Sequence, residues 1–242
     1  MTGIDPVSVQ IRLRGVRFAW RRYESDIIDI DDFTVAKGER LFIEGPSGSG
    51  KSSLLSLLGG VVVPREGRVE VLGENLSSMR GWRRDRFRAD HVGFVFQMFN
   101  LVPYLSVVDN VILPCRFSRR RRARSEARSS SVHADAMRLL AELELDRSKV
   151  IDRAVVDLSI GQQQRVAVAR SLIGSPEIVI ADEPTSALDE GTRERFLELL
   201  FNECDAEDTT LLFVSHDTRL GTLFNRRVSL KEINRSAVEA PS

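Results

Sequence analysis

The sequence has no excess of either charge and no long apolar run. Lysine and arginine together number 35, as do aspartate and glutamate, so the formal net charge of the 242 residues is zero. A general nucleic-acid binder should carry a basic excess, so the composition gives that class no support, although local basic patches can still exist. No apolar stretch approaches the about 20 residues that cross a bilayer. We therefore expect any work at a membrane to depend on a separate anchor.

Cysteine is also scarce, with only Cys115 and Cys204 in the chain. The two lie far apart and show no metal-binding spacing, which favours reduced cytosolic thiols. Residues 1–6 carry neither the basic start nor the apolar stretch of a signal peptide. We therefore expect a protein that is made and kept in the cytoplasm.

One stretch has the G-x-x-x-x-G-K-[ST] pattern of a phosphate-binding loop. It consists of Gly45, Pro46, Ser47, Gly48, Ser49, Gly50, Lys51 and Ser52. The apolar run at 40–44 before it predicts a strand, and residues 53–58 after it predict a helix that ends at two glycines. The alternative is a glycine-rich turn that binds nothing, and the order of strand, loop and helix argues against it.

The backbone sets the chemistry of such a loop. Glycines let the main chain approach a phosphate without a side chain in the way. The N–H groups, with the positive end of the following helix, hold a polyanion. Lys51 is expected to reach the β- and γ-phosphates, and the hydroxyl of Ser52 is expected to bind Mg²⁺.

Alternating apolar residues predict strands before the loop, and we expect these to form a β-layer that leads into an α/β core. Beyond the loop, strands and helices alternate, which indicates a mostly parallel sheet. The predicted strands are 7–18, 28–35, 68–73, 92–96, 178–181 and 209–214, and the predicted helices are 77–90, 162–173 and one around 196–200.

Residues 98–157 differ from this core and predict an inserted helical lobe. Ser106 caps a predicted helix that Pro114 stops, and residues 134–145 have the apolar spacing of a second helix. Between them runs the basic stretch 119–124. We interpret it as a solvated helix face in preference to a contact with anionic lipid.

Ligands of an open parallel sheet bind at the carboxyl ends of its strands. Asp182 follows four apolar residues, so we expect its carboxylate at a strand tip beside the phosphate loop, where it can hold Mg²⁺. Glu183 comes next and suits a general base that polarises an attacking water. His216 follows another predicted strand. The alternative for the two acids is a solvated strand end, which the phosphate loop upstream disfavours.

Residues 158–165, Leu-Ser-Ile-Gly-Gln-Gln-Gln-Arg, resemble the signature motif of ABC ATPases, the nucleotide-binding subunits of ABC transporters. Four other positions fall in the family's order. They are Trp20 where an aromatic residue stacks on adenine, Gln97 at the Q-loop, Asp189 at the D-loop and His216 at the switch position. The resemblance covers nearly the whole chain, and several motifs in order are far more specific than one.

The resemblance implies a fold. The expected class is α/β, a P-loop NTPase with a mostly parallel core sheet, an N-terminal antiparallel β-layer and an inserted helical lobe. It implies a single ABC ATPase domain over residues 1–242, with a RecA-like core at 7–97 and 158–231 and the lobe at 98–157. One branch of the family, which includes lipoprotein-releasing, macrolide-efflux and cell-division ATPases, is indicated by residues 94–97, 100–103 and 162–170.

The resemblance also implies ATP and Mg²⁺ as cofactors and two ATPase domains that face each other head to tail. ATP would lie between the phosphate loop of one domain and the signature motif of the other, most simply in a homodimer. The implied catalytic residues are Lys51, Gln97, Glu183 and His216, and the implied Mg²⁺ ligands are Ser52, Gln97 and Asp182. The implied nucleotide contacts are Trp20, the phosphate loop with Ser53, Ser159, Gly161, Gln162 and Asp189.

The implied partners are integral membrane permease subunits, which are not in this chain. Dimer closure and opening would power them, by export or by transmission of force, from the cytoplasmic face of the inner membrane. The alternative is a non-transport ABC-type ATPase that acts on nucleic acid or ribosomes. Such relatives typically carry coiled coils, zinc inserts or a second ATPase domain, and we expect no nucleic-acid partner. The intact phosphate loop and strand-end acids disfavour an inactive binder.

One position departs from the family pattern, because Ile160 stands where glycine is usual. A β-branched residue restricts the backbone and adds bulk near the phosphate site of the opposite domain. We expect nucleotide binding to survive, with slower hydrolysis or pairing with a different subunit.

Tyr23 is the alternative to Trp20 as the adenine-stacking residue. Residues 98–105 are expected to form part of a groove for a partner's coupling helix.

Overall fold

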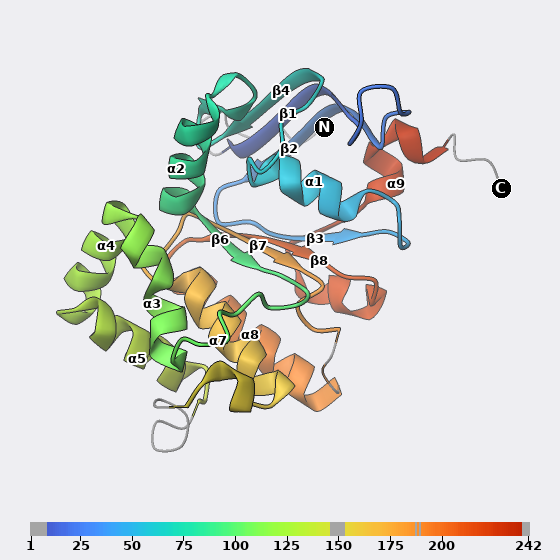
Figure 1. Cartoon of the computed structure of the whole chain (residues 1–242). Coiled ribbons are helices and arrows are strands. Elements are labelled where there is room, and N and C mark those ends of the chain that lie inside the picture. Colours follow the sequence, from blue (N-terminus) through green and yellow to red (C-terminus); the bar gives the residue numbers. More distant parts are fainter. Residues whose placement is uncertain (1–8, 146–152, 187, 189, 239–242) are drawn as a thin grey trace. The chain divides into compact units, whose positions relative to one another are not determined.

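The chain forms two compact units, and both contain strands and helices (Figure 1). The first unit comprises Met1–Arg88 and Thr210–Ser242, and the second comprises Ala89–Thr209. The computed structural model describes residues 9–145, 153–186, 188 and 190–238. In the described part of the chain, no helix combines the length and the apolar character that a bilayer crossing requires.

The first unit begins with an antiparallel sheet in the order β2-β1-β4-β5, which confirms the predicted β-layer. Its strands are β1 (Val9–Phe18), β2 (Ile28–Ala36), β4 (Glu66–Val71) and β5 (Glu74–Asn75). In β1 the side chains of Ile11, Leu13 and Val16 are buried, whereas Arg14 and Arg17 are exposed. This alternation puts one face of the sheet into the core and leaves the other face in water.

The first unit also holds parallel strands in the order β8-β3-β9. They are β3 (Arg40–Glu44), β8 (Thr210–Val214) and β9 (Arg226–Ser229). Every residue of β8 is buried, which explains why its sequence is continuously apolar and does not alternate. Helix α1 (Lys51–Leu58) lies below the antiparallel sheet in Figure 1, and the short helix α9 (Leu230–Ile233) follows β9 directly. Three 3₁₀ segments complete the unit: η2 (Leu76–Ser78), η4 (Thr218–Leu223) and η5 (Arg235–Val238).

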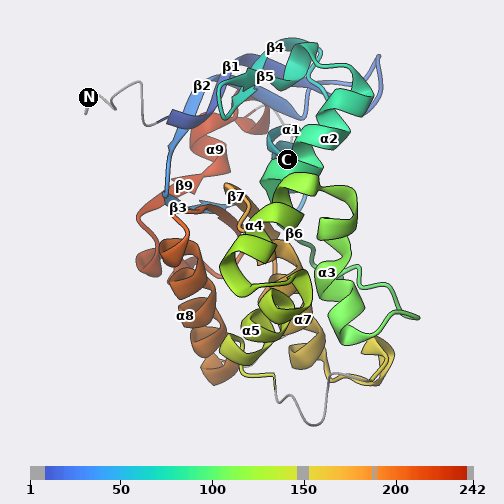
Figure 2. The same cartoon turned by 90° about the vertical axis from the view of Figure 1, so that its left-hand side faces the viewer.

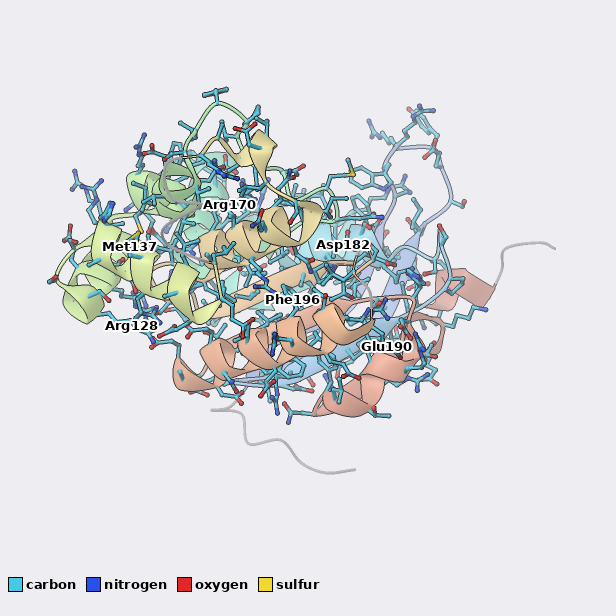
Figure 3. All side chains as sticks on the ribbon, turned by 90° about the horizontal axis from the view of Figure 1, so that it is seen from below. Arg128, Met137, Arg170, Asp182, Glu190 and Phe196 are labelled. Carbon is cyan, nitrogen blue, oxygen red and sulfur yellow. The ribbon has the colours of Figure 1, made fainter. Side chains whose placement is uncertain are left out.

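The second unit contains a parallel strand pair and a group of helices. Helix α2 (Gly81–His91) begins in the first unit and ends in the second, where β6 (Val92–Val95) follows it and pairs with β7 (Ile178–Asp182). Helices α7 (Ile160–Leu172) and α8 (Glu190–Ala206) lie side by side, and the 3₁₀ segment η3 (Val155–Asp157) precedes α7. Figure 3 shows Asp182 and Glu190 at one end of this unit and Arg128 and Met137 at the other.

Three further helices of the second unit each begin behind a serine that caps them. They are α3 (Val107–Phe117), α4 (Arg119–Ser129) and α5 (Val132–Glu142), and they pack against one another (Figure 2). The hydroxyls of Ser106, Ser118 and Ser131 accept hydrogen bonds from backbone N–H groups three residues further on. Each bond satisfies a donor that the first turn leaves open, so the serines fix where the helices start.

Pro114 does not stop the helix that Ser106 begins, contrary to the prediction. Helix α3 continues to Phe117 with the proline inside it. Proline removes one N–H donor and therefore one bond to the preceding turn. Its own carbonyl still accepts from the N–H of Ser118 at 3.0 Å, and the helix ends only at that residue.

The basic stretch 119–124 is only partly the expected solvated face: Arg119, Arg120 and Arg122 are exposed, whereas the expectation is wrong for Arg121. Arg121 is buried. Arg120 and Arg124 both pair with one carboxylate oxygen of Glu177, at 2.5 and 2.9 Å, and Nδ1 of His91 lies 3.0 Å from the other oxygen. Burial alone would raise the pKa of Glu177, but the hydrogen bonds from His91 and Arg120 outweigh it and hold the pKa at about 2.

The Glu177 carboxylate makes the free energy of unfolding depend on pH. The pKa of Glu177 falls from an ordinary 4.5 to about 2 on folding. Glu177 therefore stabilises the fold fully at a pH above its pKa in the unfolded chain. This stabilisation is lost as the pH falls through its pKa in the folded protein. We expect Glu177→Gln to lower the free energy of unfolding by about 1–3 kcal/mol at neutral pH and by much less near pH 2–3.

Urea denaturation of both proteins between pH 2.5 and 7 measures this difference. Glu126→Gln removes an exposed carboxylate of α4 and serves as the matched control, for which we expect a change within about 0.5 kcal/mol. A Glu177→Gln penalty that stays constant down to pH 2.5 would contradict the assignment.

Candidate functional site

The phosphate loop joins β3 to α1 and has the backbone that its sequence predicts. Gly48 and Gly50 have φ angles of 80° and 97°, in the region that favours glycine. A Cβ atom on Gly50 would also lie 3.1 Å from side-chain carbons of Ile27 and Ile28, so this position excludes larger residues twice over. Gly50 caps α1 without any side-chain hydrogen bond, which leaves the first N–H groups of the helix available to an anion.

Two side chains of this loop fit a bound phosphate. The Lys51 side chain is buried, and its Nζ donates to the carbonyls of Gly45 and Pro46 at 2.7 and 2.8 Å. The ammonium group is thus held inside the curve of the loop. The hydroxyl of Ser49 is buried without a hydrogen-bond partner among the described residues. A buried hydroxyl of this kind normally has a partner, and a phosphate oxygen would supply one.

Trp20 lies directly behind the phosphate loop, attached to α1. Its indole Nε1 donates to the hydroxyl of Ser53 at 3.1 Å, and its ring meets Phe18 edge-on at 5.2 Å. These contacts orient the ring while 57% of the residue stays exposed. Tyr23 is 94% exposed, and the structure gives it no comparable anchor. The position favours Trp20 over Tyr23 as the residue that stacks on a nucleotide base.

His216 lies at the same sheet edge as the phosphate loop. Strands β3 and β8 are parallel, with Ile43 opposite Val214. Gly45 and His216 each follow two residues later, so both leave the carboxyl ends of neighbouring strands. His216 is exposed there, directly after the buried Ser215. Within the first unit, the structure therefore brings together Trp20, the phosphate loop and His216.

The second unit brings together the predicted Q-loop and strand-end acids by the same geometry. Strands β6 and β7 are parallel, with Val95 opposite Ala181. Asp182 is the last residue of β7, and Gln97 follows β6, so both lie at the carboxyl edge of this pair. Glu183 has a φ angle of 50°, which is unusual for a residue with a side chain. Such backbone strain is commonly found at catalytic positions, because the surrounding structure must hold it.

The signature segment forms the start of α7. Ser159 accepts a hydrogen bond from the N–H of Gln162, and the Gln162 side chain accepts one from the N–H of Ser159, which together make a capping box. Ile160 is the first helical residue and is 57% exposed. A Cβ on Gly161 would meet only Leu188 within 4 Å, at 3.9 Å, so packing inside this chain does not require glycine there.

Gln164 connects the signature helix to the strand-end acids. Its side chain is fully buried in α7, and its amide donates to the carbonyl of Pro184, the residue after Glu183. A shift of α7 would therefore displace the backbone next to Glu183. A glutamine inside a Gln-Gln-Gln run gives no sign of which member is buried, so the sequence does not distinguish Gln164 from its two neighbours.

Arg121 holds the other end of α7. It donates to the carbonyls of Ile173 at 2.8 Å and Ser171 at 2.6 Å, and these are groups that the end of a helix leaves unpaired. The guanidinium is buried, and this burial lowers the pKa of Arg121 to about 10. Gly174 then turns with a φ of 69°, and a Cβ there would lie 2.4 Å from the backbone oxygen of Arg121. Helix α4 thus fixes where the signature helix ends.

Comparison with known proteins identifies the family. The sequence matches the family described as ABC transporter over residues 28–186, well over half of the chain. The chain belongs to the ABC transporter family. As expected from the sequence, it is an ATP-binding protein of that family, with ATPase as its enzyme class.

Full-length relatives support this membership. A lipoprotein-releasing system ATP-binding protein, LolD of Novosphingobium aromaticivorans, is 38% identical over 230 residues, covering 94% of this chain and 97% of LolD. The ABC transporter ATP-binding protein YbbA of Escherichia coli, described as uncharacterized, is 39% identical over 208 residues, or 86% and 87% of the two chains.

A solved structure confirms the fold. The dimeric ABC transporter cassette MJ0796 matches with a TM-score of 0.77 and 33% identity, over 90% of this chain and 93% of that one. A second structure of MJ0796, described as a post-hydrolysis state bound to ADP and phosphate, matches with a TM-score of 0.77 and 32% identity. The α/β class with a parallel and an antiparallel sheet is therefore the ABC cassette fold. Asp189 of the predicted site lies outside the described residues.

The contact between α4 and α7 generates a stability prediction. Replacing Arg121 by methionine keeps the apolar stem but leaves the last carbonyls of α7 buried and unpaired. We expect Arg121→Met to lower the free energy of unfolding by about 2–4 kcal/mol. Arg119→Met, at an exposed position of the same helix, should cost less than about 0.5 kcal/mol. Chemical denaturation of both variants decides the matter, and equal midpoints would show that Arg121 has no special role.

Proposed function

We propose that this ABC transporter ATPase binds ATP with Mg²⁺ at the phosphate loop and hydrolyses it with Glu183 as general base. The observation that carries the proposal is the phosphate loop itself, with its left-handed glycines, uncapped helix start and orphaned Ser49 hydroxyl. Strand ends that carry a carboxylate and a histidine support the same chemistry. Trp20 would stack on the adenine ring.

Each charged group has a definite task in this proposal. Lys51 and the loop N–H groups bind the β- and γ-phosphates, and Ser52, Gln97 and Asp182 are the residues that would hold Mg²⁺. When bound, the ion offsets the negative charge of the phosphates. Glu183 accepts a proton from the attacking water, and His216 donates a hydrogen bond to the γ-phosphate.

We further infer that the complete site forms between two copies of the chain. Ser159, Gly161 and Gln162 would then bind the γ-phosphate held by the opposite phosphate loop, with Asp189 at the seam. The loose packing at Gly161 supports this, because a Cβ there would meet only Leu188, at 3.9 Å, and the residue lies in the first turn of a helix. The dimeric cassette of MJ0796 supports the same assembly.

The work of this ATPase is proposed to be done by membrane subunits. The likeness to LolD favours partners that span the inner membrane, with this chain bound peripherally on the cytoplasmic side. Closure and opening of the ATPase pair would drive those subunits, by export or by transmission of force. The transporter relatives give no support to the alternative action on nucleic acid.

Removing the general base tests the catalytic assignment. We expect Glu183→Gln to lower ATP turnover by roughly 10²- to 10⁴-fold while ATP still binds, because the amide cannot take the proton. Turnover and ATP affinity are measured on the same preparation. Glu198→Gln, an exposed residue of α8, should leave both values unchanged. If Glu183→Gln kept wild-type turnover, another group would be the base.

The unusual isoleucine of the signature segment gives a second prediction. Ile160 projects from the start of α7 and is more than half exposed, so its bulk faces outward from this chain. We expect Ile160→Gly to preserve or raise ATP turnover, since it relieves crowding at the opposite phosphate site. Steady-state turnover and ATP-dependent dimer formation by light scattering provide the check. A tenfold loss of turnover would mean that the isoleucine is fitted to its own partner.

A further inference from the structure

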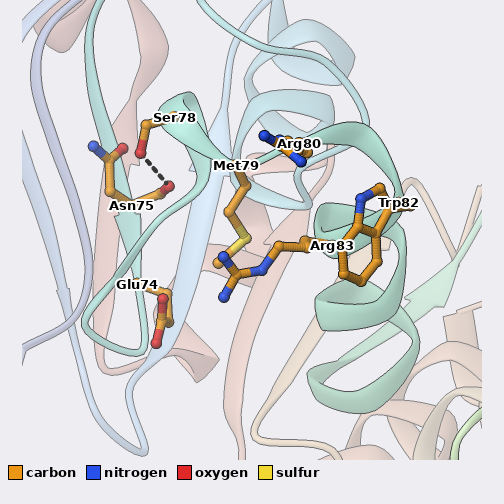
Figure 4. A pocket seen from close by; sticks show the side chains of 7 residues that line it. All are labelled: Glu74, Asn75, Ser78, Met79, Arg80, Trp82 and Arg83. Atoms are coloured by element: carbon orange, nitrogen blue, oxygen red, sulfur yellow. Dashed lines mark hydrogen bonds between the residues drawn. The ribbon is translucent and has the colours of Figure 1, made fainter.

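A cavity of about 470 Å³ opens beside the start of α2, within the first unit (Figure 4). Its lining combines cationic, apolar and hydrogen-bonding groups, contributed by Glu74, Asn75, Ser78, Met79, Arg80, Trp82 and Arg83. None of these residues belongs to the nucleotide site. We propose that this cavity binds the headgroup of an anionic phospholipid, with Arg80 and Arg83 on the phosphate and Trp82 against the glycerol and upper acyl region.

The two arginines of the cavity differ from the other arginines nearby. Arg84 donates to the carbonyls of Gly60 and Met79, and Arg88 bonds to Gly60 and Asp85, so both are used inside the unit. The guanidinium groups of Arg80 and Arg83, by contrast, have no hydrogen bond or ion pair to any described residue. Two free guanidiniums on one cavity offer paired N–H donors to a phosphate.

The apolar part of the cavity favours a lipid over a small inorganic anion. Trp82 is 69% exposed, and the sulfur-bearing side chain of Met79 also lines the cavity (Figure 4). An exposed indole next to cations suits the boundary between lipid headgroups and hydrocarbon, where its ring is buried and its N–H stays wet. Free phosphate would leave this apolar surface uncovered.

The opposite rim carries oxygen acceptors. Glu74 contributes a carboxylate, and the hydroxyl of Ser78 is bonded to the backbone oxygen of Asn75 at 3.3 Å (Figure 4). A carboxylate repels a free phosphate dianion, but it accepts hydrogen bonds from the hydroxyls of a headgroup such as glycerol. Charge complementarity therefore selects a phosphodiester that bears donors, as phosphatidylglycerol does. The same carboxylate disfavours a nucleic-acid strand, which presents one phosphate after another.

The charge pattern of α2 agrees with an anion at this place. Its first turn contains Arg83 and Arg84 and no acidic residue. Cations at a helix start oppose the helix dipole, so a bound phosphate there would relieve an unfavourable arrangement. This inference rests on the proposed function in one respect only: the proposed membrane location brings the chain close to phospholipid. Binding to vesicles does not require ATP turnover, so the two proposals can fail separately.

Tryptophan fluorescence gives a direct test on the full chain, because it contains only two tryptophans. In a Trp20→Phe background, Trp82 is the only tryptophan, so tryptophan-selective excitation reports on it alone. We expect its emission to shift to the blue with vesicles that contain phosphatidylglycerol and not with phosphatidylcholine alone. Co-sedimentation should show binding about 10- to 30-fold weaker for Arg80→Gln/Arg83→Gln, the loss expected for two cations at an anionic surface.

Matched controls separate this site from general charge attraction. Arg119→Gln/Arg122→Gln removes the same charge from exposed positions of α4 and should retain most of the binding. Equal losses for the two double variants would overturn the proposal. So would a Trp82 shift produced by inorganic phosphate or by a single-stranded oligonucleotide in place of vesicles. ATP turnover measured in parallel should be unchanged in Arg80→Gln/Arg83→Gln, and a matching loss there would mean that the cavity serves the ATPase instead.

Discussion

Backbone N–H groups can hold a phosphate only where no side chain stands in the way, and this constraint organises the first unit. Strand β3 must end at Glu44 and α1 must begin at Lys51, so that the helix start, which no side chain caps, faces the loop between them. Gly50 must turn with a positive φ against Ile28, the first residue of β2 in the antiparallel sheet, and Ile27 just before it. The antiparallel sheet therefore shapes the loop as well as covering the core, and it also contributes the chain that leads to Trp20.

The second unit is organised around a single helix that is fixed at three points. Ser159 caps the start of α7, Gln164 bonds its middle to the backbone after Glu183, and Arg121 pairs the carbonyls at its end. The contacts of Gln164 and Arg121 satisfy groups that burial would otherwise leave unpaired, and the cap of Ser159 pairs N–H groups of the exposed first turn. A helix held in this way can transmit a displacement along its length, because neither of the two buried contacts yields without leaving a polar group unpaired. This makes the signature helix the natural mechanical link between the strand-end acids and α3–α5.

The sequence alone was sufficient where local chemistry decides the structure. Glycines, strand periodicity and a lysine at fixed spacing predicted the phosphate loop and its flanks. The rule for parallel strands predicted that Gly45, Asp182 and His216 stand at strand ends, and the family resemblance added Gln97. Prediction from the sequence failed where contacts between residues distant in the chain determine the structure. Pro114 lies inside α3 because the later carbonyls still find donors, and nothing in the sequence around residues 119–124 tells that Glu177 is their partner. The left-handed backbone of Glu183 is likewise imposed by its surroundings.

Arginine shows how far the same side chain can differ in role within one molecule. On α4, Arg121 is buried among helix carbonyls, and its neighbours share Glu177, so that basic run serves the fold. On α2, Arg84 and Arg88 bond to the carbonyl of Gly60, whereas Arg83 and the preceding Arg80 line the cavity. A run of positive charge is therefore not evidence for a ligand by itself. What indicates a ligand is an arginine without an ion pair or hydrogen bond inside the fold that also lines a cavity able to bind an anion.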